Sequence, residues 1–242
     1  MGSTKIPWSE KSWNFISGCQ RITNGCLNCY ARIMAADMAG RFGYPADYPF
    51  KPGTVHENKL DEPLRVRKPT RWFVSSMGDL FHEAVKHEDF LRLWEVVKKC
   101  PQHTFIFCTK RPENMRERFK HIILPPNAWL MVTVESMDYM DRLDTLMRIP
   151  AYVHGVSVEP MLGLITIPPS LLPGVSWVIC GCESGPNRRA TEATWILNFR
   201  DQCIDNNIPF FLKQMAVNGV VKKMPEFLGK VWNQYPEVKH GH

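Results

Sequence analysis

The sequence predicts an α/β fold with a parallel sheet, and three observations support this prediction. Short apolar segments alternate with amphipathic helical segments along most of the chain, which is the pattern of βα units. The chain has 242 residues, of which 44% are hydrophobic, and this is enough for one sizeable core. Polar or charged residues directly follow one predicted strand after another. We therefore expect a single domain that spans residues 1–242.

The N-terminal part is predicted to contain one helix and one long loop. The helix runs from about Leu27 to Ala39, is rich in Ala and Met, and meets a plausible stop at Gly40. Residues 41–70 are interrupted by glycines and prolines, so we expect an irregular excursion loop there.

Strands and helices then alternate. The strands are expected at Trp72–Ser76, Thr104–Cys108, Trp129–Val134, Tyr152–Val158, Trp177–Gly181 and Pro209–Leu212. Two helices are expected at Glu88–Lys99 and Glu113–Phe119. Ser136 is expected to cap a third helix, and Thr191 a fourth.

In a parallel barrel the carboxyl ends of all strands lie on one face, where the loops build the active site. The polar residues that follow the strands would then surround one opening; they are Ser76, Asp79, Lys110, Glu135, Glu159, Glu183 and Lys213. The first loop would bring three clustered cysteines to the same opening.

These cysteines, Cys19, Cys26 and Cys29, are close enough in sequence to bind one metal centre through their thiolates. A closed zinc site needs a fourth protein ligand, for which a His or Asp such as His82 is a candidate. A four-iron cluster bound by three thiolates instead leaves one iron open to a substrate or cofactor. Both interpretations are compatible with the residues alone.

Composition narrows the class of protein. The net charge is +6 with a pI near 8.9, which favours phosphate-bearing partners but is too modest to decide alone. No apolar run is long enough to cross a bilayer, and residues 1–12 lack the apolar core of a signal peptide. The eight cysteines are few for this length and partly clustered, so we expect a reducing cytoplasm and no membrane partner.

An ordered set of motifs resembles the three-cysteine-motif, radical-SAM-like proteins of phages and bacteria. It covers roughly Trp8 to Gly219 and comprises Trp13-Asn14, Gly18-Cys19, Gly25-Cys26, Cys29-Tyr30-Ala31, Ser76, Asp79-Leu80-Phe81-His82, Thr109-Lys110-Arg111-Pro112, Val156-Ser157-Val158-Glu159-Pro160, Glu183-Ser184-Gly185, Pro209-Phe210-Phe211 and Lys213-Gln214. The chain departs from the pattern at three points. Six residues separate Cys19 from Cys26, Phe15 replaces an expected Pro, and Cys182 replaces an expected Gly.

The resemblance implies a partial (β/α) barrel of the radical SAM type. It implies that Cys19, Cys26 and Cys29 hold a [4Fe-4S] cluster whose open iron binds S-adenosylmethionine (SAM). Five residues are expected to bind this cofactor: Ser76, Gly78, Asp79, Glu135 and Ser157. Four residues are candidates for catalysis: Lys110, Glu159, Glu183 and Lys213.

The resemblance also implies a substrate class, namely DNA or a modified nucleotide, with an external electron donor as a second partner. The expected reaction is the isomerisation of an amino-acid adduct on thymidine in phage DNA hypermodification, so the protein would act in the host cytoplasm if it is phage-encoded. Four basic residues are expected to face phosphates: Lys110, Arg111, Arg188 and Arg189. The alternatives are a DNA repair enzyme of the photoproduct-lyase type and a zinc-stapled nucleic-acid-binding protein without catalytic activity.

Overall fold

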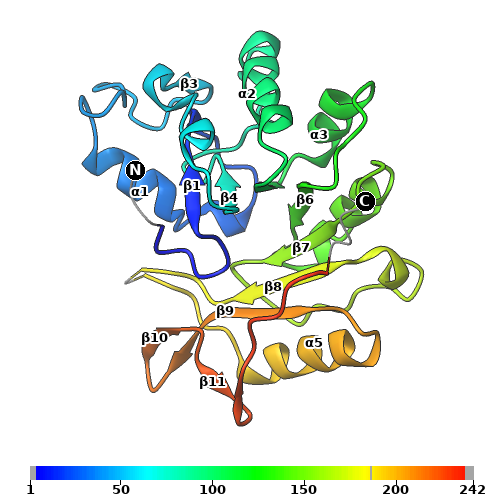
Figure 1. The fold of residues 1–242 in the computed structure, drawn as a ribbon. Helices are drawn as coiled ribbons and strands as arrows, with labels where there is room; N and C mark the ends of the chain where they lie inside the picture. Colours follow the sequence, from blue (N-terminus) through cyan, green and yellow to red (C-terminus); the bar gives the residue numbers. More distant parts are fainter. Residues whose placement is uncertain (1–3, 186, 238–242) are drawn as a thin grey trace.

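The computed structural model describes residues 4–185 and 187–237. An eight-stranded sheet, curled into a half-barrel, dominates it in the order β1-β4-β5-β6-β7-β8-β9-β10 (Figure 1). All neighbours from β1 to β9 are parallel, and only β10 runs antiparallel to β9. The predicted α/β fold and its parallel, partial barrel are therefore confirmed. The strands are β1 (Lys11–Trp13), β4 (Arg71–Val74), β5 (Thr104–Thr109), β6 (Ala128–Thr133), β7 (His154–Val158), β8 (Trp177–Gly181), β9 (Phe210–Val217) and β10 (Val220–Lys223).

Five α-helices accompany the sheet in the described part of the chain, and Figure 1 shows α2 and α3 above the upper strands and α5 beneath β9. They are α1 (Tyr30–Asp37), α2 (His87–Lys99), α3 (Pro112–Phe119), α4 (Asp141–Met147) and α5 (Ala193–Asp205). The helix α1 begins later than predicted, because a 3-10 turn, η1 (Asn24–Cys26), precedes it and the backbone of Cys29 is extended. None of the helices described is both long and apolar enough to span a membrane.

The loop predicted at residues 41–70 is largely irregular. It contains only short elements: β3 (Thr54–Val55), which pairs with β2 (Ile16–Ser17), and two 3-10 turns, η2 (Glu57–Lys59) and η3 (Pro63–Arg65). Three further short elements lie elsewhere: η5 (Leu172–Gly174), β11 (Glu226–Phe227) and β12 (Lys230–Val231).

Both predicted serine and threonine caps are wrong. Ser136 precedes a 3-10 turn, η4 (Met137–Tyr139), and its hydroxyl donates to the Asp138 side chain, so α4 begins only at Asp141. The Thr191 hydroxyl donates to the carbonyl of Met161, and Glu192 takes the N-cap position of α5. In each case a nearby acceptor competes successfully for the hydroxyl group.

The last predicted strand is also longer than expected. β9 continues to Val217 and turns into β10 through Asn218 and Gly219, which have φ values of 50° and 75°. An Asn-Gly pair is a frequent hairpin turn because both of its residues tolerate positive φ. Lys213 therefore lies within β9 rather than after it.

The two faces of the sheet belong to two different apolar clusters. Alternate residues of β5, such as Phe105 and Phe107, join the core beneath the helices, while Ile106 points to the inner face of the half-barrel. Trp129, Trp177 and Phe211 fill this inner face together with Trp8 from the N-terminal segment. Aromatic side chains thus fill the interior of the half-barrel, and its lining becomes polar toward the carboxyl ends of the strands.

Candidate functional site

A cavity of about 210 Å³ lies at the carboxyl ends of the parallel strands. The cysteine loop, which carries Cys19, Cys26 and Cys29, contributes to its lining, as do residues at the ends of β4 to β9, the N-terminal segment and α1. It is lined by Cys19, Cys26 and Cys29 and by eight of the other predicted site residues, which are Ser76, Gly78, Asp79, Lys110, Ser157, Glu159, Glu183 and Lys213. Residues up to about 190 positions apart in sequence are therefore brought together by the parallel topology. Glu135 is fully buried and stands behind this lining.

Two glycines hold the first cysteine against the end of β4. The Gly18 amide donates to the Met77 carbonyl at 2.9 Å, and the Asp79 amide donates to the Gly18 carbonyl at 3.2 Å. A Cβ on Gly18 would lie 1.8 Å from the Lys51 carbonyl oxygen, and one on Gly78 would lie 2.6 Å from the Gly18 nitrogen. Only glycine permits this close approach, which places Cys19 beside Asp79.

The middle of the cysteine loop lies against an ion-paired cluster. Lys110 Nζ is 3.0 Å from Glu135 Oε1 and 3.8 Å from Cys26 Sγ, and Arg142 Nη1 is 2.9 Å from Glu135 Oε2. The Thr23 hydroxyl also donates to Glu135. Burial raises the pKa of Glu135, but Lys110, Thr23 and Arg142 outweigh burial and lower it below its ordinary value. The carboxylate is therefore held in its ionised form.

The cysteines differ in their electrostatic surroundings. Burial raises the pKa of Cys26, but the positive charge of Lys110 and hydrogen bonds from Ile22 and Thr23 outweigh burial and lower it. Burial raises the pKa of Cys19 to about 12, with a further contribution from the negative charge of Asp79, while Arg111 acts in the opposite direction. In the metal-free protein Cys26 is thus the more easily ionised of these two thiols.

A second buried pair flanks Cys19. Arg111 Nη1 lies 3.1 Å from Asp79 Oδ2 and 3.4 Å from Cys19 Sγ. Asp79 also accepts the Thr109 hydroxyl at 2.8 Å and the Phe81 amide at 3.0 Å. Arg111 is therefore placed to neutralise both the carboxylate and a Cys19 thiolate.

The donor set fits a thiolate-bound metal group. Cys19, Cys26 and Cys29 are free thiols that line one cavity, and guanidinium and ammonium groups lie beside two of them to offset thiolate charge. Among the described residues, no three His, Cys, Asp or Glu side chains are assembled closely enough to hold a single ion. His82 is absent from the cavity lining, and its Nδ1 accepts the Ala84 amide at 3.0 Å.

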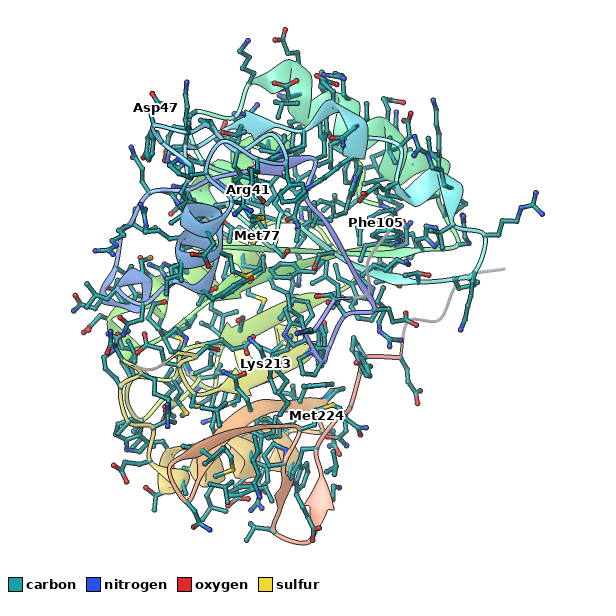
Figure 2. All side chains as sticks on the ribbon, turned by 90° about the vertical axis from the view of Figure 1, so that its left-hand side faces the viewer. Arg41, Asp47, Met77, Phe105, Lys213 and Met224 are labelled. Carbon is teal, nitrogen blue, oxygen red and sulfur yellow. The ribbon has the colours of Figure 1, made fainter. Side chains whose placement is uncertain are left out.

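Glu159 and Lys213 form the charged pair on the opposite side of the cavity. Lys213 Nζ lies 2.8 Å from Glu159 Oε1, although its direction does not meet the geometry of a hydrogen bond. Trp8 Nε1 donates to Glu159 Oε2 at 3.3 Å, and the Ser157 hydroxyl donates to the same oxygen at 3.5 Å. The Glu159–Pro160 peptide is cis. Figure 2 shows Lys213 over the strands of the lower half of the sheet.

Glu183 connects the end of β8 to the cysteine loop. It accepts Asn28 Nδ2 at 2.9 Å and the Arg189 amide at 2.9 Å, and the Arg189 guanidinium also donates to it. Arg189 Nη1 donates to the Asn24 carbonyl at 2.9 Å. Burial raises the pKa of Glu183, but the hydrogen bonds from Arg189 and Asn28 outweigh burial and lower it.

The four basic residues expected to face phosphates are otherwise engaged. Lys110 and Arg111 belong to the ion pairs beside the cysteines, and Arg189 is paired with Glu183. Arg188 donates to the carbonyls of Gly185 and Gly219. Each of these side chains has an acceptor within the protein, and the expectation that they face phosphates stays a prediction.

Among the lining residues that sequence reasoning did not assign to the site are Trp8, Tyr30, Cys108 and Thr133. Cys108 and Thr133 lie on the inner face two positions after Ile106 and Met131, so the period-two pattern of a strand could have indicated them. The Cys108 sulfur lies 3.5 Å from the Thr133 hydroxyl, and burial raises its pKa to about 11. Nothing local marks Trp8, which reaches the site from outside the barrel strands.

Comparison with known proteins gives one family and three solved structures. The model of a family described as "Protein of unknown function (DUF5131)" matches residues 3–236. No curated protein sequence matches the chain. The solved structures are a cysteine-to-serine mutant of spore photoproduct lyase (13% identity, TM-score 0.48), a tyrosine-to-phenylalanine mutant of it (12%, 0.42), and spore photoproduct lyase complexed with dinucleoside spore photoproduct (12%, 0.44). Each comparison covers 92% of this chain and 70% of the other.

Proposed function

The chain belongs to the DUF5131 family, and we propose that it is a radical SAM-type enzyme whose cysteine loop holds a [4Fe-4S] cluster. One observation carries the proposal. Cys19, Cys26 and Cys29 line the same cavity as the polar residues that end the parallel strands. A structural metal staple would not require this convergence of charged groups, whereas a reaction centre does.

In its bound form, the cluster with SAM would supply a 5′-deoxyadenosyl radical that abstracts a hydrogen atom from the substrate. The first contribution of the chain itself is electrostatic. Lys110 beside Cys26 and Arg111 beside Cys19 would offset the negative charge of the thiolates. Glu135 is a positioning residue, because it holds Lys110 from behind the cavity wall.

Ser76, Gly78, Asp79 and Ser157 are proposed to bind the SAM molecule from the ends of β4 and β7. The hydroxyls of Ser76 and Ser157 can donate or accept hydrogen bonds. Asp79 already binds Arg111 and Thr109, so its carboxylate is rigidly oriented. Tyr30 donates to the Ser76 carbonyl at 2.6 Å and thereby fixes that loop beside the cysteines.

Lys213, Glu159 and Glu183 are proposed to act on the substrate. The Lys213 ammonium can hold an anionic or carbonyl group and can donate a proton from Nζ, and Glu159 can accept a proton at Oε1. Trp8 and the aromatic side chains beneath the cavity keep water from entering through the inner face. Such exclusion is needed wherever a carbon radical must survive.

The finer proposal is that the substrate is a thymidine carrying an amino-acid adduct, and that the reaction isomerises this adduct during DNA hypermodification. The sequence resemblance supports this substrate, and the basic net charge agrees with it. A base would have to leave the duplex to reach the cavity.

Electron paramagnetic resonance tests the cluster directly. Anaerobically reconstituted and reduced protein should give a [4Fe-4S]⁺ signal that shifts when SAM is added. Cys26→Ala should abolish the signal. Cys203→Ala, which removes a buried thiol of α5 itself, is the matched control and should keep the signal.

The opposite result would be a colourless protein with tightly bound zinc and no SAM-dependent signal, and it would contradict the proposal. A separate assay of 5′-deoxyadenosine release on adduct-bearing, unmodified and irradiated DNA tests the substrate. Release that is greatest with irradiated DNA would contradict the isomerase and favour repair.

A further inference from the structure

A second cavity of about 690 Å³ adjoins the first and is strongly basic. Its lining comes from the N-terminal segment, β1, α1, β9 and β10, together with β4 and the residues after it, Ser184, and the stretch from η2 to Glu62. β1 and β10 are the two end strands of the curled sheet, and both lie toward the left of Figure 1, the side that Figure 2 turns to the viewer. The cavity is therefore the lateral opening of the half-barrel; we refer to it as the lysine cleft.

The charged side chains of the lysine cleft are almost all positive. It is lined by five lysines, Lys5, Lys11, Lys59, Lys213 and Lys223, and by a single carboxylate, Glu62. Among residues 4–185 and 187–237, only Lys213 of these lysines forms an ion pair. Lys223 Nζ donates to the Lys5 carbonyl at 2.6 Å, which ties the last strand of the sheet to the N-terminal segment.

Lys223 is repelled by two of the other lysines. Burial lowers the pKa of Lys223, and the positive charges of Lys213 and Lys5 lower it further. A concave surface with many like charges attracts an anion that carries several opposite charges, and binding of this anion relieves the repulsion between the lysines. Lysine ammonium groups act as point charges that bind phosphate oxygens without demanding a fixed orientation.

The lysine cleft leads into the reaction cavity. Five residues line both: Ile6, Tyr30, Ser76, Ser184 and Lys213. A chain held along the lysines could therefore place one of its units in the smaller cavity. The Tyr30 ring stands at this junction, where an unstacked base could pack on it.

We propose that the lysine cleft binds the phosphate backbone of a polynucleotide strand and directs one nucleotide toward the reaction cavity. The binding of a strand in the lysine cleft does not depend on the proposed function; only the reaction of the nucleotide in the reaction cavity rests on it. Three observations carry it: four of the five lysines form no salt bridge within the described residues, the opening measures about 690 Å³, and it is continuous with the site. A polynucleotide is favoured because it presents one phosphate per unit along a flexible chain, as a row of point charges requires.

The test uses the full-length, metal-free protein and a fluorescent oligo(dT) of about twelve nucleotides, a length within the usual range of single-strand sites. Fluorescence anisotropy gives the affinity at several salt concentrations. The variant Lys5→Gln/Lys11→Gln/Lys223→Gln should bind at least about tenfold more weakly at low salt. Its slope of log K against log salt should be smaller by about 2, because each phosphate contact on a single strand contributes about 0.7.

A matched variant, Lys98→Gln/Lys99→Gln/Lys120→Gln, removes the same charge from α2 and the end of α3. It should leave affinity and slope unchanged. Equal losses in both variants would overturn the proposal, as would displacement of the oligonucleotide by polyglutamate at equal charge. Equal competition by thymidine monophosphate, compared per phosphate, would also overturn it and would indicate a free nucleotide.

This binding test and the resonance test fail independently. Oligonucleotide binding that depends on the lysine cleft, without a cluster signal, would uphold the cleft and contradict the radical enzyme. A cluster signal without such binding would support the radical enzyme and contradict the lysine cleft.

Discussion

The Lys110 ammonium lies 3.8 Å from the Cys26 sulfur, and it is held there by a carboxylate that does not itself enter the cavity. This contact links Cys26, a candidate metal ligand, to Lys110, which directly follows β5. The two thiols differ because Lys110 and hydrogen bonds lower the pKa of Cys26, whereas burial and the negative charge of Asp79 raise the pKa of Cys19 against the opposing effect of Arg111.

Lys110→Met should raise the pKa of Cys26. The positive charge of Lys110 lowers this pKa against the effect of burial, so its removal leaves burial to dominate. An upward shift is expected, because a positive charge at this distance favours the ionised form of the thiol. The check is the pH dependence of Cys26 alkylation in the metal-free protein, followed by mass spectrometry. Lys120→Met, on an exposed side chain, is the control; the same shift there would refute the pairing.

Gly25→Ala should displace the cysteine loop. The new Cβ would lie 2.7 Å from Glu135 Oε1 and 2.8 Å from Lys110 Nζ, both held in a buried cluster. A loss of about 1 to 3 kcal/mol in the free energy of unfolding is expected, together with a lower iron content after reconstitution. Gly163→Ala is the control, because nothing lies within 4 Å of its Cβ. Urea unfolding measures both, and equal stability of the two variants would contradict the close approach.

Glu135→Gln should destabilise the protein by about 2 to 4 kcal/mol, because it leaves Lys110 and Arg142 without their buried partner. The folded-state pKa of Glu135 is lowered from 4.5, so its stabilising effect is present above pH 4.5 and is lost as pH falls through the lower folded value. The stability difference between wild type and variant should therefore shrink below pH 4.5. Glu117→Gln, in an exposed pair with Lys120, should change stability by less than about 0.5 kcal/mol at every pH.

His56 should make the protein less stable in mild acid. Burial lowers its pKa from 6.5 to about 4, and its ring bonds the Ser17 hydroxyl at 2.7 Å. Below pH 6.5 the unfolded chain binds a proton that the folded chain resists, so stability falls until about pH 4. The total loss is up to about 3 kcal/mol.

Urea unfolding at several pH values checks this, with His56→Asn as the variant and exposed His121→Gln as the control. The free energy of unfolding should depend less on pH between 6.5 and 4 in His56→Asn than in the wild type, and His121→Gln should show no such change. An unchanged slope in His56→Asn would assign the acid sensitivity to other groups.

Much of the fold was accessible from local patterns. The strand at Trp177–Gly181 and the helix α2 were predicted within a residue. The strand is a short apolar run that is buried on both faces, and the helix repeats its apolar residues with a period of 3.6. The hairpin through Asn218 and Gly219 had a readable signal that the prediction did not use. The caps failed because the acceptors that take the hydroxyls of Ser136 and Thr191 cannot be ranked from the sequence.

The sequence by itself determined the alternation of strands and helices, the grouping of three cysteines, and the polar residues at the strand ends. Only the tertiary structure decided which charges meet: Lys110 with Glu135, Arg111 with Asp79, and Lys213 with Glu159. It also decided that the end strands β1 and β10 border a lysine cleft. The physical reason is separation along the chain, because contacts between distant residues depend on strand register and packing, which no local pattern encodes.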